Sequence, residues 1–280
     1  MSQGKKLKEL IHQEEIILTP GCFDALSAIL AEKAGFKALV MGGYSVSASF
    51  LGKPDMGILT MKEMADAVNR ITDSCGLPLI ADGDTGFGGE WNVRRAVKEY
   101  EKAGAAAIIL EDQTFPKRCG HLSGKSVIPK EEHGNKIRIA KETAHDMLVF
   151  ARTDALALSG FDEAVSRAQF YLRCGADGIF IEAPKNENDL IMIGRQLKGQ
   201  TLIVNNIEGG KTPLLPLDSL KKMGYKIVMH PVLGLYLYAK NIFDGYQTLL
   251  NDGSSSAINN AFTFDEFNEI LKMKDYIKRN

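Results

Sequence analysis

The chain has 280 residues and a formal net charge of −1 at pH 7, which suits one large α/β barrel or two modest domains with a sizeable core. Its near-neutral charge and scattered basic residues give no reason to expect nucleic acid or an acidic membrane surface as a partner. No apolar run is long enough to cross a bilayer, and residues 1–13 are too polar for a secretory signal. The four cysteines lack metal-finger spacing and suit reduced thiols. We therefore expect a soluble cytoplasmic protein.

Eight short apolar runs recur along the chain without strict alternation, as expected for parallel strands that are buried on both faces. In chain order they are Ile16–Thr19, Ala38–Met41, Leu77–Ala81, Ala107–Leu110, Met147–Ala151, Gly178–Ile181, Leu202–Val204 and Ile227–Met229. Amphipathic helical patterns separate them, and Thr60 followed by Glu63 predicts a capping box. Three of these helical patterns end at a glycine, namely Gly35, Gly104 and Gly175, and a similar join to the next strand follows each of them.

This recurrence predicts a (β/α)8 TIM barrel. A doubly wound open sheet is the alternative, but no Gly-x-Gly-x-x-Gly follows the first strand. We find no linker and expect one domain over residues 1–280. Residues 254–280 follow the last strand and predict an additional C-terminal helical segment. Its apolar residues recur at helical spacing, which suits packing on a partner subunit or on its own barrel.

Polar side chains follow the ends of the predicted strands. They include Asp24, Tyr44, Ser45, Asp82, Asp84, Glu111, Asp112, Arg152, Asp154, Glu182, Asn205, Glu208 and His230. Catalytic groups of such barrels lie at the carboxyl ends of the strands, so this convergence predicts the active site there. Arg152 suits a clamp for a substrate carboxylate, although an ion pair with Asp154 would also explain it. His230 either faces the pocket or satisfies a backbone carbonyl.

Asp82 and Asp84 precede a glycine-rich loop, and two carboxylates in this arrangement can hold a hard divalent cation. The alternative is that they cap the next helix, but Glu111 on the neighbouring strand end favours the metal.

Cys119 lies in the sequence Lys117-Arg118-Cys119-Gly120-His121. Neighbouring cations favour the thiolate and lower the thiol pKa, so this cysteine suits proton transfer or attack on carbon. The other cysteines suit buried positions. Three histidines, namely His12, His133 and His145, suit the surface.

Several segments resemble the isocitrate lyase and phosphoenolpyruvate mutase superfamily, and in particular its short-chain carbon–carbon lyases. These segments are residues 43–49, 52–55, 82–86, 111–113, 116–121, 151–154 and 208–213. The resemblance implies a TIM barrel, Mg²⁺ with Mn²⁺ able to replace it, and a homotetramer whose dimers exchange a terminal helix. It also implies cleavage of a dicarboxylate of the 2-alkylmalate type, such as 2,3-dimethylmalate or 2-methylisocitrate, to pyruvate and a carboxylate.

The same resemblance implies roles for individual residues. Asp82 would bind the metal directly, and Asp55, Asp84 and Glu111 would hold metal-bound waters. Cys119 would be the proton donor, with Lys117 and His121 beside it. The substrate would contact Asp82, Arg152, Glu182, Asn205 and the segment formed by Gly43, Tyr44 and Ser45.

Three questions stay open at this point. The base that removes the substrate's hydroxyl proton is Tyr44, Glu182 or a metal-bound hydroxide. Oxaloacetate hydrolysis to oxalate and acetate is an alternative activity, although Pro231 stands near the place where hydrolases of this kind carry a hydroxyl group. A barrel that has lost catalysis and serves as a binding or assembly protein is a third possibility. We expect Gly120 and Gly124 to act as hinges of a closing loop that carries Cys119.

Overall fold

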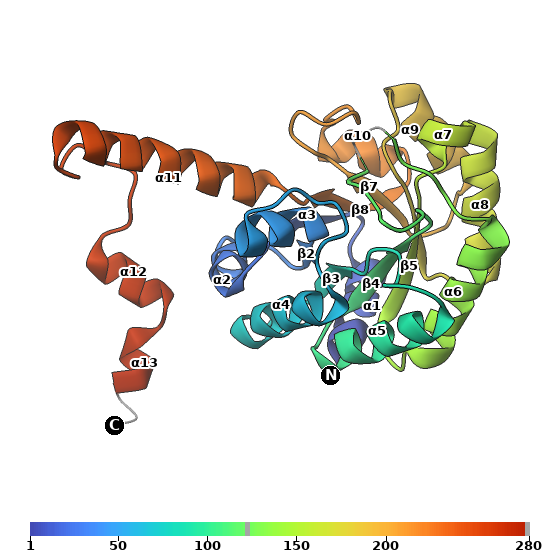
Figure 1. The fold of residues 1–280 in the computed structure, drawn as a ribbon, viewed down its shortest axis with the longest axis horizontal. Helices are drawn as coiled ribbons and strands as arrows, with labels where there is room; N and C mark the ends of the chain where they lie inside the picture. Colours follow the sequence, from blue (N-terminus) through green and yellow to red (C-terminus); the bar gives the residue numbers. More distant parts are fainter. Residues whose placement is uncertain (121–123, 278–280) are drawn as a thin grey trace. The chain divides into compact units, whose positions relative to one another are not determined.

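The computed structural model describes residues 1–120 and 124–277 (Figure 1). Contacts within the chain group it into two compact units, Met1–Leu233 and Gly234–Asn280. None of the described helices combines the length and the apolar character needed to cross a membrane.

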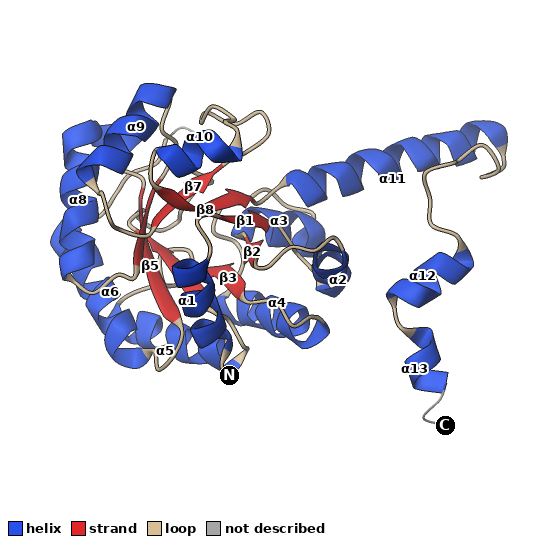
Figure 2. Cartoon of the chain, turned by 180° about the vertical axis from the view of Figure 1, so that it is seen from behind, coloured by secondary structure: helices blue, strands red, loops and turns tan. Residues whose placement is uncertain are grey.

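The first unit is built on one sheet of eight parallel strands (Figure 2). The strands are β1 (Ile17–Pro20), β2 (Leu39–Met41), β3 (Leu79–Asp82), β4 (Ala107–Glu111), β5 (Leu148–Thr153), β6 (Gly178–Ile181), β7 (Leu202–Asn205) and β8 (Tyr225–His230). Their order is β1-β8-β7-β6-β5-β4-β3-β2. A parallel bridge from Gly21 to Val40 joins the two ends of the sheet, and the Cys22 amide donates to the Val40 carbonyl at 2.9 Å. The predicted (β/α)8 barrel is therefore confirmed.

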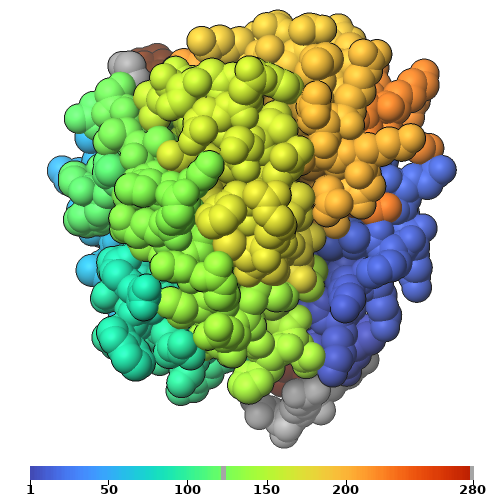
Figure 3. Space-filling view, turned by 90° about the vertical axis from the view of Figure 1, so that its right-hand side faces the viewer, coloured from blue at the N-terminus to red at the C-terminus, as the bar shows by residue number. Residues whose placement is uncertain are grey.

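Helices cover the outside of the barrel, and α5, α6, α8 and α9 contact one another in turn (Figure 3). The helices of this unit are α1 (Gln3–Gln13), α2 (Ala25–Lys33), α3 (Gly43–Val46), the π-helical turn η1 (Ser47–Leu51), α4 (Met61–Ser74), α5 (Glu90–Lys102), α6 (Lys130–Thr143), α7 (Leu156–Ser159), α8 (Phe161–Arg173), α9 (Glu187–Gln196) and α10 (Leu217–Lys222). The predicted capping box is present, because the Thr60 amide donates to Glu63 at 2.8 Å and the Glu63 amide donates to the Thr60 hydroxyl at 3.3 Å.

Two apolar layers follow from the alternation of side chains along each strand. The inner layer fills the barrel with residues from all eight strands, and α1 contributes Leu7 to the same cluster. The outer layer packs the other strand face against the helices. In β3, for example, Ile80 belongs to the inner layer, whereas Leu79 and Ala81 belong to the outer one. A strand-end residue two positions after an inner residue therefore faces the mouth of the barrel.

The second unit is helical, as predicted for the C-terminal segment. It contains α12 (Phe264–Ile270), α13 (Met273–Ile277) and the part of α11 (Leu233–Asp252) that begins at Gly234. Many of its large apolar side chains are exposed in the single chain, including Leu237, Tyr238, Phe243, Tyr246, Leu250, Phe262, Phe264, Tyr276 and Ile277. Their use in packing between subunits stays a prediction.

Candidate active site

Five predicted site residues share the inward strand face at the carboxyl end of the barrel. Alternation places each two positions after an inner-layer residue, as Asp82 follows Ile80 and Glu111 follows Ile109. The other three are Arg152, Glu182 and Asn205, which follow Phe150, Phe180 and Ile203. The structure thus brings together side chains that lie more than one hundred residues apart in the sequence.

Asp82 ties the ends of two neighbouring strands together. One carboxylate oxygen accepts the Gly43 amide at 2.9 Å, and the other accepts the Asp84 amide at 3.0 Å. A Cβ atom at Gly43 would lie 3.2 Å from Asp84 Oδ1 and 3.3 Å from both Asp82 Oδ2 and Lys117 Nζ. The absence of a side chain at Gly43 therefore allows the start of α3 to approach the carboxylates closely.

The Lys117 ammonium group lies among these carboxylates and is 3% exposed. Its Nζ atom is 2.7 Å from Asp55 Oδ1 and 2.7 Å from Asp84 Oδ1. Burial alone would lower the lysine pKa, but Asp84, Asp82, Glu111 and Asp55 raise it well above its ordinary value. Lys117 is therefore a permanent cation at the centre of the acidic cluster.

Burial dominates the electrostatics of two carboxylates in this cluster. It raises the pKa of Asp84 to about 6 despite the nearby Lys117. It also raises the pKa of Glu111 well above its usual value, although Arg152 and Lys117 oppose the change. The ionised form of a carboxylate buried in this way is stabilised by a further cation nearby.

The donor set fits Mg²⁺. Asp55, Asp82, Asp84 and Glu111 supply hard oxygen atoms, and Glu111 Oε1 is buried without a hydrogen-bond partner. Among residues 1–120 and 124–277, no three or more His, Cys, Asp or Glu side chains are arranged as direct ligands of one ion. Mg²⁺ commonly keeps several waters and uses only one or two protein carboxylates, so this arrangement suits that ion. The individual ligand roles stay predictions.

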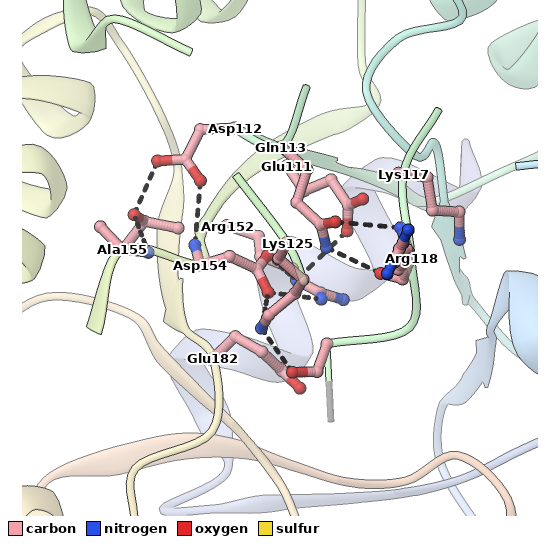
Figure 4. A network of polar contacts seen from close by, with 12 residues as sticks. Glu111, Asp112, Gln113, Lys117, Arg118, Lys125, Arg152, Asp154, Ala155 and Glu182 are labelled. Carbon is pink, nitrogen blue, oxygen red and sulfur yellow. Dashed lines mark hydrogen bonds and ion pairs between the residues drawn. The ribbon is translucent and has the colours of Figure 1, made fainter. Parts of the chain in front are cut away.

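Arg152 forms the ion pair with Asp154 that its sequence position allowed, and its role as a clamp for a substrate carboxylate stays a prediction. Its guanidinium group donates to Asp154 through Nε at 2.9 Å and through a terminal nitrogen at 3.2 Å, and Nε lies 3.3 Å from Glu111 Oε2 (Figure 4). Nearby, Asn205 donates to Glu182 at 3.3 Å, while the Asn205 carbonyl oxygen is buried without a partner. The mouth therefore offers a guanidinium, an amide and a carboxylate side by side.

The segment that carries Cys119 leaves β4 and is held at its base by an antiparallel bridge between Gln113 and Val127. The Thr114 amide donates to the Ser126 carbonyl at 2.9 Å, and the Ile128 amide donates to the Asp112 carbonyl at 2.9 Å. Above this base, the Gln113 side chain donates to the Arg118 carbonyl at 2.9 Å and accepts the Arg118 amide at 3.0 Å. Residues up to Gly120 thereby extend over the mouth of the barrel.

Gly120 touches two of the predicted catalytic residues. A Cβ atom there would lie 2.4 Å from the terminal nitrogen of Arg152 and 2.4 Å from Glu182 Oε1. Cys119 beside it is half-buried. Its proton-donor role stays a prediction, and His121 lies outside the described residues. Gly124 has a φ of +77°, which suits a glycine in a turn.

Ser45 is buried, but its hydroxyl group donates to the Pro231 carbonyl at 3.1 Å. The Ser45 amide donates to the Gly42 carbonyl at 3.1 Å, and the Gly43 amide is already bound to Asp82. Contacts of Gly43, Tyr44 and Ser45 with substrate stay predictions.

Two residues at strand ends face away from the mouth. Asp112 follows the inward Glu111 and points outward, where it accepts hydrogen bonds from Thr153, the Asp154 amide, Tyr171 and Arg167 at 2.7–3.1 Å. His230 shares the outer face with Val228 and pairs with Glu208 at 2.9 Å. The His230 side chain therefore neither faces the mouth of the barrel nor bonds a backbone carbonyl; its partner is the Glu208 carboxylate.

The surface position predicted for His133 is wrong, because its side chain is fully buried. Its ring packs edge-on against Tyr171 at a centroid distance of 4.7 Å and lies near the backbone of Leu110. His12 and His145 are exposed, as predicted.

Sequence reasoning missed Lys125 as well. Its side chain is 2% exposed, donates to the Gly120 carbonyl and lies 2.6 Å from Asp154 Oδ1. No local pattern marks a buried lysine in a loop, because both of its partners are supplied by the folded barrel.

Comparison with known proteins agrees with this architecture. The family described as phosphoenolpyruvate phosphomutase matches residues 7–240. The chain is 43% identical to 2,3-dimethylmalate lyase of Eubacterium barkeri, with 98% of this chain and 96% of that protein covered. It is 42% identical to a chloroplastic carboxyvinyl-carboxyphosphonate phosphorylmutase of Arabidopsis thaliana, with 98% and 82% covered. It is 40% identical to 2-methylisocitrate lyase of Aeropyrum pernix, with 99% and 90% covered.

Solved structures give the same fold. Oxaloacetate acetylhydrolase in complex with 3,3-difluorooxalacetate superimposes with a TM-score of 0.94 at 34% identity, with 99% of this chain and 95% of that chain covered. Phosphonopyruvate hydrolase in complex with oxalate and Mg²⁺ gives a TM-score of 0.90 at 28% identity, with 99% and 98% covered.

Proposed function

Because the chain belongs to the phosphoenolpyruvate mutase/isocitrate lyase superfamily, we propose that it is a Mg²⁺-dependent carbon–carbon lyase. Its substrate is of the 2-alkylmalate type, either the dicarboxylate 2,3-dimethylmalate or the tricarboxylate 2-methylisocitrate, and its products are pyruvate and a second carboxylate. The observation that carries the proposal is the arrangement of the mouth. A buried acidic cluster with Lys117 lies beside Arg152 and Glu182, and the backbone next to Cys119 contacts both of the latter.

Cleavage of such a substrate breaks its C2–C3 bond. The C2 hydroxyl group loses a proton as C2 becomes the ketone carbon of pyruvate, and the electron pair of the broken bond passes to C3. Asp82, with Asp55, Asp84 and Glu111, would hold Mg²⁺, which when bound would supply a Lewis acid that favours loss of the hydroxyl proton.

Two residues of the chain serve the departing half of the substrate. Negative charge grows on the carboxylate attached to C3, and Arg152 binds that carboxylate and offsets the charge. Cys119 then gives its thiol proton to C3, and the proton released from the C2 hydroxyl restores the thiol. A thiol suits this step because its ordinary pKa of about 8.5 lies close enough to neutrality for acid–base catalysis. The backbone of residues 118–120 keeps water away from the reacting atoms.

The test is pyruvate release from 2,3-dimethylmalate and 2-methylisocitrate, each measured with Mg²⁺, with Mn²⁺ and with excess chelator. Pyruvate that appears with metal and disappears with chelator supports the lyase. Absence of pyruvate from both substrates under every condition removes this assignment.

Oxaloacetate hydrolysis to oxalate and acetate is the second candidate, because an acetylhydrolase superimposes over 99% of this chain. In this chain Pro231 follows β8 where a hydroxyl group would serve the hydrolase, and its carbonyl is used by Ser45. Oxalate release from oxaloacetate, without pyruvate release from 2,3-dimethylmalate or 2-methylisocitrate, would favour the hydrolase.

The proposal includes a homotetramer whose dimers exchange the C-terminal helices. The exposed apolar side chains of residues 234–277 support it, since burying them between subunits removes apolar surface from water. Light scattering of the full-length protein, compared with a variant that ends at residue 253, tests the assembly. The proposal also includes a cytoplasmic location, because free cysteines such as the four of this chain are typical of a reducing compartment.

A further inference from the structure

Lys125 lies on the returning arm of the Cys119 segment, one residue before the paired base of that segment. Its side chain is 2% exposed, whereas buried lysines ordinarily require a compensating partner. The ammonium group has two partners: the carboxylate of Asp154 at 2.6 Å and the backbone carbonyl of Gly120. Lys125 therefore joins the tip of the segment to the end of β5 (Figure 4).

Asp154 is itself rigidly held. Its side chain is fully buried and binds Arg152 in addition to Lys125. Its amide donates to Asp112 at 2.9 Å, and Asp112 also accepts hydrogen bonds from Tyr171 and Arg167 of α8. These hydrogen bonds fix the end of β5 to α8, so the Asp154 carboxylate that binds Lys125 has a fixed position.

The hydrogen bond from Lys125 holds the Gly120 backbone close to two predicted catalytic residues. The Gly120 backbone lies so near Arg152 and Glu182 that a Cβ atom would be 2.4 Å from each of them. On the other side of Cys119, the Gln113 side chain binds both the amide and the carbonyl of Arg118. Cys119 is therefore held between two fixed peptide groups, one secured by Gln113 and the other by Lys125.

We propose that Lys125 is a positioning residue, which holds the Cys119–Gly120 peptide over Arg152 and Glu182 by linking the Gly120 carbonyl to Asp154. The proposal rests on the proposed lyase function for its effect on turnover, but the placement of the thiol can be tested without activity. Lys125 does not contact the acidic cluster, so its loss leaves the metal-binding groups in place.

The test uses the full-length Lys125→Met variant, which keeps the length of the stem and removes the ammonium group. We expect kcat for pyruvate release to fall by about 10- to 100-fold, because small displacements of a reacting group have effects of that size. The Mn²⁺ dissociation constant should stay within twofold of the wild-type value. Lys141→Met is the matched control, since Lys141 forms an ion pair of the same length, 2.6 Å, with Asp177 away from the mouth.

Alkylation of the thiols by iodoacetamide, followed by peptide mass analysis, supplies a readout independent of catalysis. Cys119 should react at least fivefold faster in Lys125→Met than in the wild type or in Lys141→Met. Cys75, which is half-buried in another part of the barrel, should react at an unchanged rate. Equal acceleration at both cysteines would mean general loosening of the fold and would overturn the proposal, as would an unchanged rate at Cys119.

Gly120→Ala provides a second route if Lys125→Met does not fold. Its methyl group would collide with Arg152 and Glu182, so the peptide should be displaced while Lys125 remains, and Cys119 should again react faster. An unchanged rate in this variant would contradict the placement. If the wild type releases no pyruvate but both variants show faster alkylation of Cys119, the proposed lyase function fails and the positioning role stands.

Discussion

The ammonium group of Lys117 lies 2.7 Å from the carboxylate of Asp84, in a cluster that also contains Asp55, Asp82 and Glu111. Lys117 and Arg152, whose Nε atom lies 3.3 Å from Glu111, are two cations beside four carboxylates. The remaining shortage of positive charge is what makes the cluster suitable for a divalent cation. We therefore expect the charge of Lys117 to oppose the binding of a further cation in this cluster.

Replacing this lysine should strengthen metal binding. In Lys117→Met, the cluster loses a buried positive charge that repels an incoming cation, so the Mn²⁺ affinity should rise by about tenfold, a modest fraction of the Coulomb energy at such distances. Turnover should nevertheless fall. Titration calorimetry measures the affinity, and Lys62→Met, which removes an exposed lysine paired with Asp66, is the control. Weaker binding in Lys117→Met would show that the lysine organises the carboxylates instead of competing with the ion.

Asp82→Asn should have the opposite effect on the ion. The amide keeps the size of the side chain but removes the negative charge predicted to contact the metal, so Mn²⁺ affinity should fall by about 1.4 kcal/mol or more, which is tenfold. Asp66→Asn, at a half-exposed side chain away from the cluster, is the control. An unchanged affinity in Asp82→Asn would mean that other carboxylates of the cluster bind the metal.

Cys119→Ser tests the proton donor. A serine hydroxyl is a far weaker acid than a thiol, so turnover should fall by about 100-fold or more, within the range that acid–base catalysis contributes. Mn²⁺ binding should be preserved because the segment backbone is fixed by Gln113 and Lys125. Cys75→Ser is the matched control. Turnover of Cys119→Ser near the wild-type rate would remove the cysteine from the mechanism.

Much of this arrangement could be predicted from the sequence, because parallel strands that are buried on both faces form apolar runs and polar groups at their ends reach one mouth. The outward direction of Asp112 follows from the same physics, since adjacent strand residues point to opposite faces. His133 is a different case. The expected surface position is wrong because Ile137 and Ala140 continue the helical face of His133 at i+4 and i+7, and this face is buried. The partners of Lys125 belong to β5 and to the tip of its own segment, so no local pattern could predict them.

The hydrogen bonds around Asp112 should matter mainly for stability. Asp112→Ala leaves the buried Arg167 guanidinium without this carboxylate, and it leaves the Asp154 amide and the Thr153 hydroxyl without their acceptor. Breaking a buried pair in this way costs about 3–5 kcal/mol. Urea unfolding followed by circular dichroism measures the loss, and Asp177→Ala, at a half-exposed ion pair, should cost much less. Equal losses of unfolding free energy in the two variants would mean that the buried hydrogen bonds of Asp112 stabilise the fold no more than a half-exposed ion pair does.

His133 should make the protein less stable in mild acid. Burial, assisted by the charges of Lys136 and Arg167, lowers the pKa of His133 from 6.5 to about 3 in the folded chain. Between these values the unfolded chain binds a proton that the folded chain cannot bind, so the free energy of unfolding falls as the pH drops below 6.5. At pH 5 this one residue costs about 2 kcal/mol relative to pH 8.

Replacing His133 removes that proton from the unfolded chain. The difference in unfolding free energy between pH 8 and pH 5 should therefore shrink by about 2 kcal/mol in His133→Leu, whereas the exposed His145→Leu should behave like the wild type. Urea unfolding at the two pH values measures both variants. Because carboxylates contribute to acid sensitivity equally in all three proteins, they cancel in this comparison. An unchanged pH dependence in His133→Leu would mean that the imidazole is protonated in the folded chain at pH 5, and hence that water or a carbonyl group reaches it.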